Sequence, residues 1–422
     1  MSDSKLSCSQ PSDSKRVDSR GPDSSRSAAA LGLSPGAAAA ASGGRQLPTA
    51  ASSSDGYLSS GQSPGAVSGG GSGPHGDDTP ARLHLFGPGQ VGRAFLRQLA
   101  QRADRDAFRL VAVSDRSGTA YDVDGFDPLV LLAHKEGGGA ALELPRAEAI
   151  PTELAIQLVA ADVVVDATPS DAEQTEAAVR RGQAALQCGA ALALCSKNGL
   201  SRSACRWLAA GTRARIGCNA VLGGTGAQLV AELDELRRDC RGLAIVGNVT
   251  TTAIVTAIEA GATLAEGIAE AERLGFLEPS ARLDLDGSDA ATKLLCVFGA
   301  VFGESWVRTP SLESVLREHV SELDPATLRE RAERCATTRL VARATRPGAG
   351  GKLTVRFEEL PTGSPLAAPA DRVVYGYELA SGLRVHTGLG VGYERTAEAL
   401  WRDVAAQIAS GASQAAGREV TQ

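Results

Sequence analysis

Three glycines, at positions 87, 89 and 92, constrain the fold of this chain more than any other feature. They follow a short apolar stretch, residues 82–86 (RLHLF), and precede a helical stretch, residues 93–102. In a strand–turn–helix unit of this kind, the first glycine permits the turn, the second lets the backbone approach a pyrophosphate, and the third lets helix and strand pack closely. The free N–H groups at the helix start attract phosphate. We therefore predict a dinucleotide site that contains Gly87, Gly89, Gln90, Val91 and Gly92. The alternative is a turn used for packing alone.

Two neighbouring residues give opposite indications about which dinucleotide binds. Asp115 lies 23 residues after Gly92, at the end of the next apolar stretch, where an acid can bond the adenosine ribose and favours NAD. Arg116 follows it directly and can pair with the 2′-phosphate of NADP. The sequence therefore predicts NAD or NADP as the cofactor and leaves the choice between them open.

Apolar and helical stretches continue to alternate after this turn. We expect strands at residues 108–113, 162–167 and 190–195, and helices at 170–187 and from 201. This alternation predicts an α/β fold with a Rossmann-type, doubly wound parallel sheet.

After residue 220 the pattern changes. Helices are expected at residues 250–260 and 263–274, then strands at 338–345, 353–358, 372–379 and 383–386, then a helix at 396–409. Grouped helices and strands predict a second, α+β domain for substrate binding and dimerisation. The expected organisation is an N-terminal extension (1–80), a dinucleotide-binding domain (81–220), the second domain (221–365), a segment that returns to the first domain (366–410) and a tail (411–422).

Residues 1–80 are rich in Ser, Ala, Gly and Pro and contain one aromatic residue, Tyr57. Such a composition buries too little apolar area to offset the entropy of ordering, so we expect disorder. A plastid transit peptide is the alternative, because residues 24–54 lack acids, although four aspartates precede them. We expect a cytoplasmic protein. The net charge of −6 does not favour nucleic acid as a partner, and the sequence lacks the apolar run of about 18 residues that a membrane span needs.

Residues 275–294 (GFLEPSARLDLDGSDAATKL) concentrate chemically useful side chains. Asp289 and Lys293 are spaced i, i+4 and share one face if the segment is helical, and Glu278 and Asp284 precede them. Clustered acids suit an ammonium group, and a lysine suits proton delivery to an oxygen. On spacing alone, the alternative of a solvated helix face with a stabilising ion pair is favoured.

The same segment resembles the signature of the homoserine dehydrogenase family, roughly G-[YF]-x-E-x-[DN]-P-x-x-D-x-x-G-x-D-x-x-x-K. It departs from that signature at Ser280 and Ala281. Four further segments are similar to family motifs, so the resemblance covers about residues 82–410: residues 163–168 (VVVDAT), 194–200 (LCSKNGL), 248–252 (NVTTT) and 388–397 with its three glycines.

The resemblance implies a reaction and assigns residues to it. The enzyme would interconvert L-aspartate 4-semialdehyde and L-homoserine with NAD(P), in the pathway to threonine, methionine and isoleucine, as a homodimer without a kinase or C-terminal regulatory domain. Lys293 would deliver the proton, Lys197 would bind an oxygen of the substrate and contact the cofactor, and Asp289 would position Lys293. The substrate ammonium group would be held by Glu278 and Asp284, and the cofactor also by Thr168 and Gly390.

Several departures from the family pattern leave alternatives open. Asn219 stands where the family has Glu, before a glycine-rich turn that in the family can hold a monovalent cation. A cation near Asn219, Leu222 and Gly224 is therefore an open expectation. Val249 and Thr252 replace a Gly and an Asn. The alternatives are a dehydrogenase for another small amino-acid aldehyde and a catalytically silent NAD(P)-binding protein.

Overall fold

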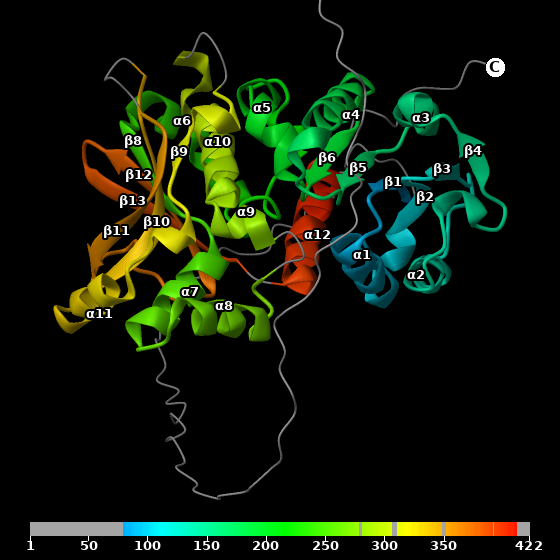
Figure 1. The fold of residues 1–422 in the computed structure, drawn as a ribbon. Helices are drawn as coiled ribbons and strands as arrows, with labels where there is room; N and C mark the ends of the chain where they lie inside the picture. The colour runs from blue at the N-terminus through cyan, green and yellow to red at the C-terminus, as the bar shows by residue number, and fades with distance from the viewer. Residues whose placement is uncertain (1–78, 278–280, 306–309, 348–351, 391, 412–422) are drawn as a thin grey trace, which may run out of the picture. The chain divides into compact units, whose positions relative to one another are not determined.

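The computed structural model describes residues 79–277, 281–305, 310–347, 352–390 and 392–411. Seven of the described strands form a first sheet in the order β4-β3-β2-β1-β5-β6-β7 (Figure 1). Its strands are β1 (Ala81–Phe86), β2 (Phe108–Asp115), β3 (Gly118–Tyr121), β4 (Glu148–Ile150), β5 (Val163–Asp166), β6 (Ala191–Leu194) and β7 (Ile216–Gly217). The parallel, Rossmann-type sheet is thereby confirmed for five strands. The edge strands β3 and β4 pair antiparallel, which the sequence analysis did not predict.

Helices cover both faces of this sheet, which is what the term doubly wound describes. Alternate residues of β1, β5 and β6 point to opposite sides. Leu83, Val163 and Ala191 pack with helices α1 and α12, whereas Val164 and Leu192 pack with α4 and α5. The helices of this half are α1 (Gln90–Gln101), α2 (Pro128–Glu136), α3 (Thr152–Val159), α4 (Thr175–Gln187), α5 (Lys197–Trp207) and the distant α12 (Tyr393–Ala409).

Among the helices that begin earlier than predicted, α1 and α5 each have a residue at the helix start that explains the difference. Gly89 adopts an extended conformation and acts as the N-cap of α1, so the helix begins at Gln90. Ser196 caps α5 through its side chain, so that helix begins at Lys197 instead of residue 201. This early start places Lys197 in the first turn of a helix, directly after the carboxyl end of β6.

Six strands form a second sheet in the order β13-β12-β8-β10-β11-β9. All neighbours pair antiparallel except β9 and β11. The strands are β8 (Gly242–Val246), β9 (Leu316–Arg317), β10 (Ala336–Thr345), β11 (Thr354–Pro361), β12 (Arg372–Leu379) and β13 (Gly382–Leu389). The sequence analysis missed β8. This strand is buried at every position, so it shows no alternation of polar and apolar residues.

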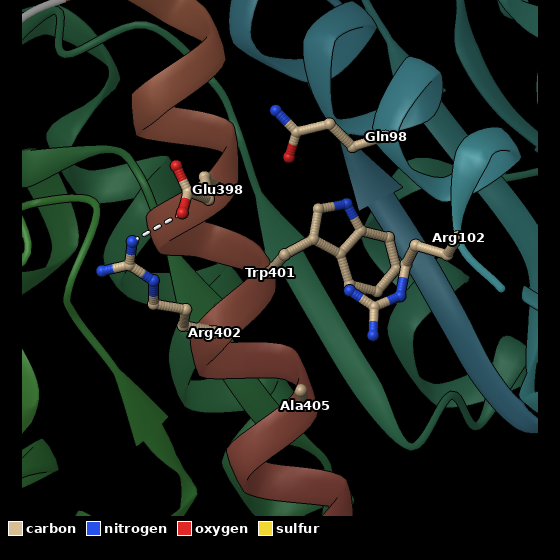
Figure 2. A pocket seen from close by; sticks show the side chains of 6 residues that line it. All are labelled: Gln98, Arg102, Glu398, Trp401, Arg402 and Ala405. Carbon is tan, nitrogen blue, oxygen red and sulfur yellow. Dashed lines mark hydrogen bonds and ion pairs between the residues drawn. The ribbon is translucent and has the colours of Figure 1, made fainter. Parts of the chain in front are cut away.

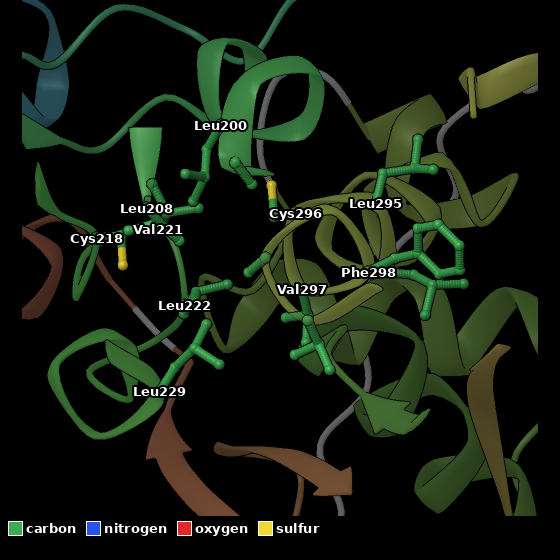
Figure 3. Packing of buried hydrophobic residues seen from close by; sticks show 14 of the residues in the cluster. Leu200, Leu208, Cys218, Val221, Leu222, Leu229, Leu295, Cys296, Val297 and Phe298 are labelled. Carbon is green, nitrogen blue, oxygen red and sulfur yellow. The ribbon is translucent and has the colours of Figure 1, made fainter. Parts of the chain in front are cut away.

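One face of the second sheet packs against α6 (Gly226–Asp239) and α10 (Ser288–Phe302). The same apolar cluster continues to α5, so α10 lies between the second sheet and the first half of the molecule (Figure 3). The remaining helices are α7 (Val249–Glu259), α8 (Leu264–Arg273), α9 (Ala281–Leu285) and α11 (Pro325–Glu333). No helix in the described part of the chain has the length and apolar character needed to cross a lipid bilayer.

The stretch predicted to return to the first domain, residues 366–410, belongs to both halves of the molecule. Its strands β12 and β13 belong to the second sheet, and its helix α12 packs against α1, β5, β6 and β7. The expected extension at residues 1–80 and the tail at 411–422 lie almost entirely outside the described residues.

Candidate functional site

The turn between β1 and α1 leaves room for a ligand at one glycine and none at the other two. A methyl group on Gly87 would lie 2.7 Å from the backbone N of Thr168, and one on Gly92 would lie 2.4 Å from the carbonyl oxygen of Gly87. A methyl group on Gly89 would meet nothing within 4 Å. No side chain caps α1, and its first turn carries no acid. The turn therefore offers a close backbone approach and uncapped helix N–H groups, which suit a pyrophosphate.

Thr168 lies beside this turn because β5 runs next to β1. Its hydroxyl donates to Oδ1 of Asp166 at 2.5 Å and accepts from Arg181 at 3.1 Å. Arg181 also pairs with Asp166, with 2.8 Å between Nη2 and Oδ2. This network fixes the end of β5 at the edge where the predicted cofactor residues gather. Gln90 and Val91 form the first turn of α1 at the same place.

Asp115 lies at the end of β2, but both of its carboxylate oxygens are already engaged. Oδ1 accepts from the backbone N and the hydroxyl of Ser117, at 2.8 and 2.5 Å. Oδ2 accepts from Lys135 at 2.6 Å and from the backbone N of Ala141 at 2.9 Å. Burial opposes ionisation of Asp115, but the bonds from Lys135 and Ser117 outweigh it and lower its pKa. Arg116 is exposed beside this cluster.

Two lysines from different helices meet at one aspartate. Asp289, in the first turn of α10, pairs through Oδ2 with Lys293 at 2.9 Å and through Oδ1 with Lys197 at 3.3 Å. The side chains of Asp289, Lys293 and Lys197 are 14, 15 and 20% exposed, respectively. Lys293 also donates to the carbonyl oxygen of Gly247, directly after β8. The three predicted catalytic residues therefore lie together. Lys197 comes from the start of α5, which follows β6, and Asp289 and Lys293 come from the start of α10, which contacts the end of β8.

The aspartate predicted to bind substrate lies next to this triad. Asn248 donates from Nδ2 to Asp284 at 2.7 Å and to Asp289 at 3.2 Å. The Thr250 hydroxyl, which has one hydrogen, lies 3.1 Å from Asp284 and 2.6 Å from the carbonyl oxygen of Phe276. Burial and the nearby charge of Asp289 raise the pKa of Asp284 to about 6. Burial also acts against ionisation of Asp289, but Lys293 and Lys197 hold its pKa well below the usual range. The two carboxylates thus differ in environment, although they share a donor.

Glu278 lies outside the described residues. Gly390, predicted to contact the cofactor, lies against Val249 and Val373, where a methyl group would come within 2.4 and 2.8 Å of their γ-carbons. Val249, which replaces a family glycine, therefore packs tightly against a backbone segment. Thr252, which replaces a family asparagine, donates its hydroxyl to the carbonyl oxygen of Asn248 at 2.9 Å.

The turn from Asn219 to Gly226, which connects β7 to α6, was the candidate for a cation. The Asn219 carbonyl accepts from Gly224 and Leu222, and its side-chain oxygen accepts from Ala227 at 2.9 Å. The Leu222 carbonyl accepts from the backbone N and the hydroxyl of Thr225. The oxygens of Asn219 and Leu222 are therefore engaged in hydrogen bonds within the turn.

Asp403 of α12 completes this turn. It accepts from the backbone N of Asn219 at 2.8 Å and from its Nδ2 at 2.7 Å. Burial raises the pKa of Asp403 to about 7, in spite of these bonds and another from the backbone of Ala220. The turn is therefore fastened to α12 by a buried carboxylate.

A pocket of about 270 Å³ between α1 and α12 lies apart from both clusters (Figure 2). It is lined by Gln98, Arg102, Glu398, Trp401, Arg402 and Ala405. Arg102 is bound to Asp104 and Arg402 to Glu398, so both cations already have carboxylate partners. None of the six lining residues belongs to the glycine turn or the lysine cluster, so we attribute the chemistry to those two sites.

Sequence reasoning missed three residues that shape these sites. Asn248 was quoted as part of a motif without a role, although an Asn directly before a helix is a recognisable cap. Lys135 and Asp403 lie on helices with ordinary surface patterns, and nothing in the sequence indicated that they contact Asp115 and Asn219.

Comparisons with known proteins agree with this geometry. Residues 230–405 match the family model described as homoserine dehydrogenase. Homoserine dehydrogenase from Methanocaldococcus jannaschii is 26% identical over 337 residues, which is 76% of this chain and 96% of that protein. The NAD(+)-dependent homoserine dehydrogenase of Pseudomonas canavaninivorans is 25% identical over 348 residues, 77% of this chain and 96% of that protein.

A solved structure of a hyperthermophilic archaeal homoserine dehydrogenase in complex with NADPH has the same fold. It aligns with a TM-score of 0.60 at 24% identity and covers 79% of this chain and 98% of that one. The family-model match contains α7, α9, α10 and most of α12 but not the glycine turn at residues 87–92. The curated relatives and this structure extend the similarity over most of the described chain.

Proposed function

The chain belongs to the homoserine dehydrogenase family, as an NAD(P)-dependent oxidoreductase that acts on a CH–OH group, and from this we propose how its residues interconvert L-aspartate 4-semialdehyde and L-homoserine. The observation that carries the proposal is the placement of Asp289 between Lys197 and Lys293. Two ammonium groups converge there, next to a carboxylate that can receive an amine. A substrate with an aldehyde or alcohol at one end and an amino-acid group at the other matches this arrangement.

The glycine turn fits the dinucleotide. Gly87, Gly89 and Gly92 would hold its pyrophosphate against the start of α1, with Gln90 and Val91 in the same turn and Thr168 and Gly390 nearer the reacting end. Bound there, the nicotinamide supplies or accepts the hydride, and the protein orients and polarises the substrate.

We propose that the chain prefers NADP(H) to NAD(H). A ribose diol needs a free carboxylate to accept its hydrogen bonds, and both oxygens of Asp115 are engaged. The exposed Arg116 would instead place a positive charge beside a 2′-phosphate, whereas the charge of Lys135 is matched by its partner Asp115. One relative is named NAD(+)-dependent and one solved relative was complexed with NADPH, so both cofactors occur among similar proteins. The ratio of kcat/KM for NADP+ and NAD+ tests the preference, and Arg116→Glu should reverse it.

In the direction of reduction, Lys293 would donate the proton to the oxygen that becomes the alcohol. Lys197 would bond the same oxygen or the substrate carboxylate and stabilise negative charge as it develops. Asp289 would hold both lysines in place, because each of its oxygens pairs with one of them. Asp284, with Glu278, would receive the substrate ammonium group.

The test is NADP+ reduction that depends on L-homoserine, followed by absorbance at mildly alkaline pH. Lys293→Ala should lower kcat by about 1,000-fold, because a positioned acid or base contributes 10²–10⁴-fold. Binding of NADPH, measured by fluorescence, should stay within about two-fold. Lys352→Ala, at an exposed lysine far along the sequence, is the matched control and should leave kcat unchanged. A Lys293→Ala enzyme within a few-fold of wild type would show that this lysine is not the proton donor.

Assembly, location and pathway are also part of the proposal. We expect a homodimer that uses the second domain (221–365), a cytoplasmic or plastid location according to the nature of residues 1–80, and a role in synthesis of the aspartate-derived amino acids. The family resemblance supports these expectations. Light scattering of the purified chain, with a mass of twice 43.2 kDa expected, tests the dimer.

A further inference from the structure

Asn248 occupies the narrow space between two acids of the active-site cluster. It is 4% exposed and stands between β8 and α7. Its Nδ2 group donates to Oδ1 of Asp284 at 2.7 Å and to Oδ2 of Asp289 at 3.2 Å. An amide NH2 carries two hydrogens, so each acid receives one and the donor is fully used.

The other end of the same amide determines this orientation. Oδ1 of Asn248 accepts from the backbone N of Thr251 at 2.8 Å and from its hydroxyl at 3.1 Å, so Asn248 is the N-cap of α7. Only the amide oxygen can accept the Thr251 N–H, and this bond turns the NH2 group toward the acids. The helix cap therefore positions the donor.

The two acids depend on this donor unequally. Asp289 has Lys197 and Lys293 as partners. Asp284 has a hydrogen bond from Asn248 and shares the single hydrogen of the Thr250 hydroxyl with the closer carbonyl oxygen of Phe276. Lys293 of α10 is its favourable charge and Asp289 of α10 the unfavourable one. On the short helix α9 itself, Arg282 is exposed and is directed to Asp286 at 4.0 Å. Loss of the Asn248 donor should therefore affect Asp284 more than Asp289.

We propose that Asn248 is a positioning residue that holds the carboxylates of Asp284 and Asp289 side by side and keeps Asp284 anionic, ready for the substrate ammonium group. The inference rests on the proposed function, in which Asp284 binds that group. It assigns a separate role to each end of the Asn248 side chain. The amide oxygen caps helix α7, and the NH2 group reduces the repulsion between the two carboxylates.

Two variants separate these tasks. Asn248→Ser and Asn248→Asp both retain an oxygen that can cap α7, because Ser, Asp and Asn are all good caps. Ser removes the shared donor, and Asp replaces it with a third carboxylate. The pKa of Asp284 is already raised to about 6, and either variant should raise it further. The acidic limb of kcat/KM for L-homoserine should then move up by about one pH unit, and KM at pH 7 should rise about tenfold, the size expected for a hydrogen bond to a charged group.

The effect of Asn248→Asp should exceed that of Asn248→Ser, and Kd for NADPH should stay within about two-fold in both. Thr263→Ala, which removes the cap of α8, is the control for loss of capping and should leave the pH profile in place. An unchanged acidic limb and an unchanged KM in the folded Ser and Asp variants would overturn the proposal.

A second measurement keeps this proposal separate from the proposed function. The carboxyl carbons of ¹³C-labelled aspartates can be titrated by NMR in wild type and in Asn248→Ser, with Asp284→Asn to assign the resonance. If wild type does not oxidise homoserine, the proposed function fails, but a higher titration midpoint for Asp284 in the Ser variant still supports the role of Asn248. An unchanged midpoint contradicts it whatever the substrate.

Discussion

Two glycine-rich turns, each between a strand of the first sheet and a helix, perform opposite tasks in this molecule. The first, Gly87–Gly92 between β1 and α1, has open space at Gly89, and no side chain caps the helix that follows. In the second, Asn219–Gly226 between β7 and α6, Asn219 donates two hydrogen bonds to the carboxylate of Asp403. The side-chain oxygen of Asn219 also accepts from the backbone N of Ala227, in the first turn of α6. Glycines in a turn therefore indicate close backbone contacts. Whether the N–H groups of the following helix are free or bonded to protein side chains indicates whether the turn can bind a ligand.

The largest effect should come from removal of the carboxylate that fastens the second turn. Asp403→Ala leaves the buried amide groups of Asn219 without acceptors and creates a cavity. We expect a loss of about 3 kcal/mol in the free energy of unfolding, from the cost of unsatisfied buried polar groups. Urea denaturation measures it. Glu398→Ala, on the exposed side of the same helix, is the control and should cost little. If Asp403→Ala lowers the free energy of unfolding by less than about 1 kcal/mol, the second turn is stable without its bonds to Asp403.

A methyl group in the first turn should affect binding and leave folding intact. Gly89→Ala adds a side chain that meets no protein atom within 4 Å. It should weaken NADPH binding about 100-fold, or about 2.7 kcal/mol, because it occupies the approach of the pyrophosphate. Fluorescence titration gives the Kd and thermal unfolding the stability. Unchanged affinity would show that the turn serves packing alone.

The matched change in the second turn should do the reverse. Gly223 has φ +59°, and a methyl group there would lie 2.6 Å from Cγ2 of Val373. Gly223→Ala should therefore lower the free energy of unfolding by about 2 kcal/mol through backbone strain and crowding. The folded fraction should bind NADPH as wild type does. A variant that is stable but binds poorly would place the second turn in the cofactor site and break the distinction.

The smallest effect should come from monovalent cations. Because the oxygens of Asn219 and Leu222 are engaged, replacing K+ with Na+ or choline at constant ionic strength should change kcat/KM less than about two-fold. Constant ionic strength matters, since screening alone alters charged sites. A requirement for K+ or Na+ that saturates at millimolar concentration would show that the second turn opens to hold an ion.

Prediction from the sequence succeeded where the physical cause is local. The glycine turn and the i, i+4 pair of Asp289 and Lys293 follow from neighbouring residues, and the pair forms at 2.9 Å. The assignment of Lys197 to the same site as Asp289 came from family resemblance, because 92 residues separate them in the sequence. Their ion pair was not predicted. The fully buried strand β8 carried no periodic signal. Contacts such as Asn219–Asp403, 184 residues apart, depend on the finished fold and have no local signature.

The docking of α12 has a consequence for how this protein is made (Figure 1). Three side chains of α12 bond to the first half. Trp401 donates to the carbonyl oxygen of Phe95, and Gln407 donates to the carbonyl oxygen of Leu192. The Asp403 carboxylate accepts a hydrogen bond from the side-chain amide of Asn219. The dinucleotide-binding half is synthesised before the second half, yet the part of its sheet that α12 covers, over β5, β6 and β7, stays uncovered until residues near 409 have been synthesised. At translation rates of about 5–20 residues per second, its apolar face waits for many seconds. Chaperones that recognise exposed apolar surface should therefore bind this half during synthesis. Folding of the first half can be completed only after the chain has been synthesised through α12.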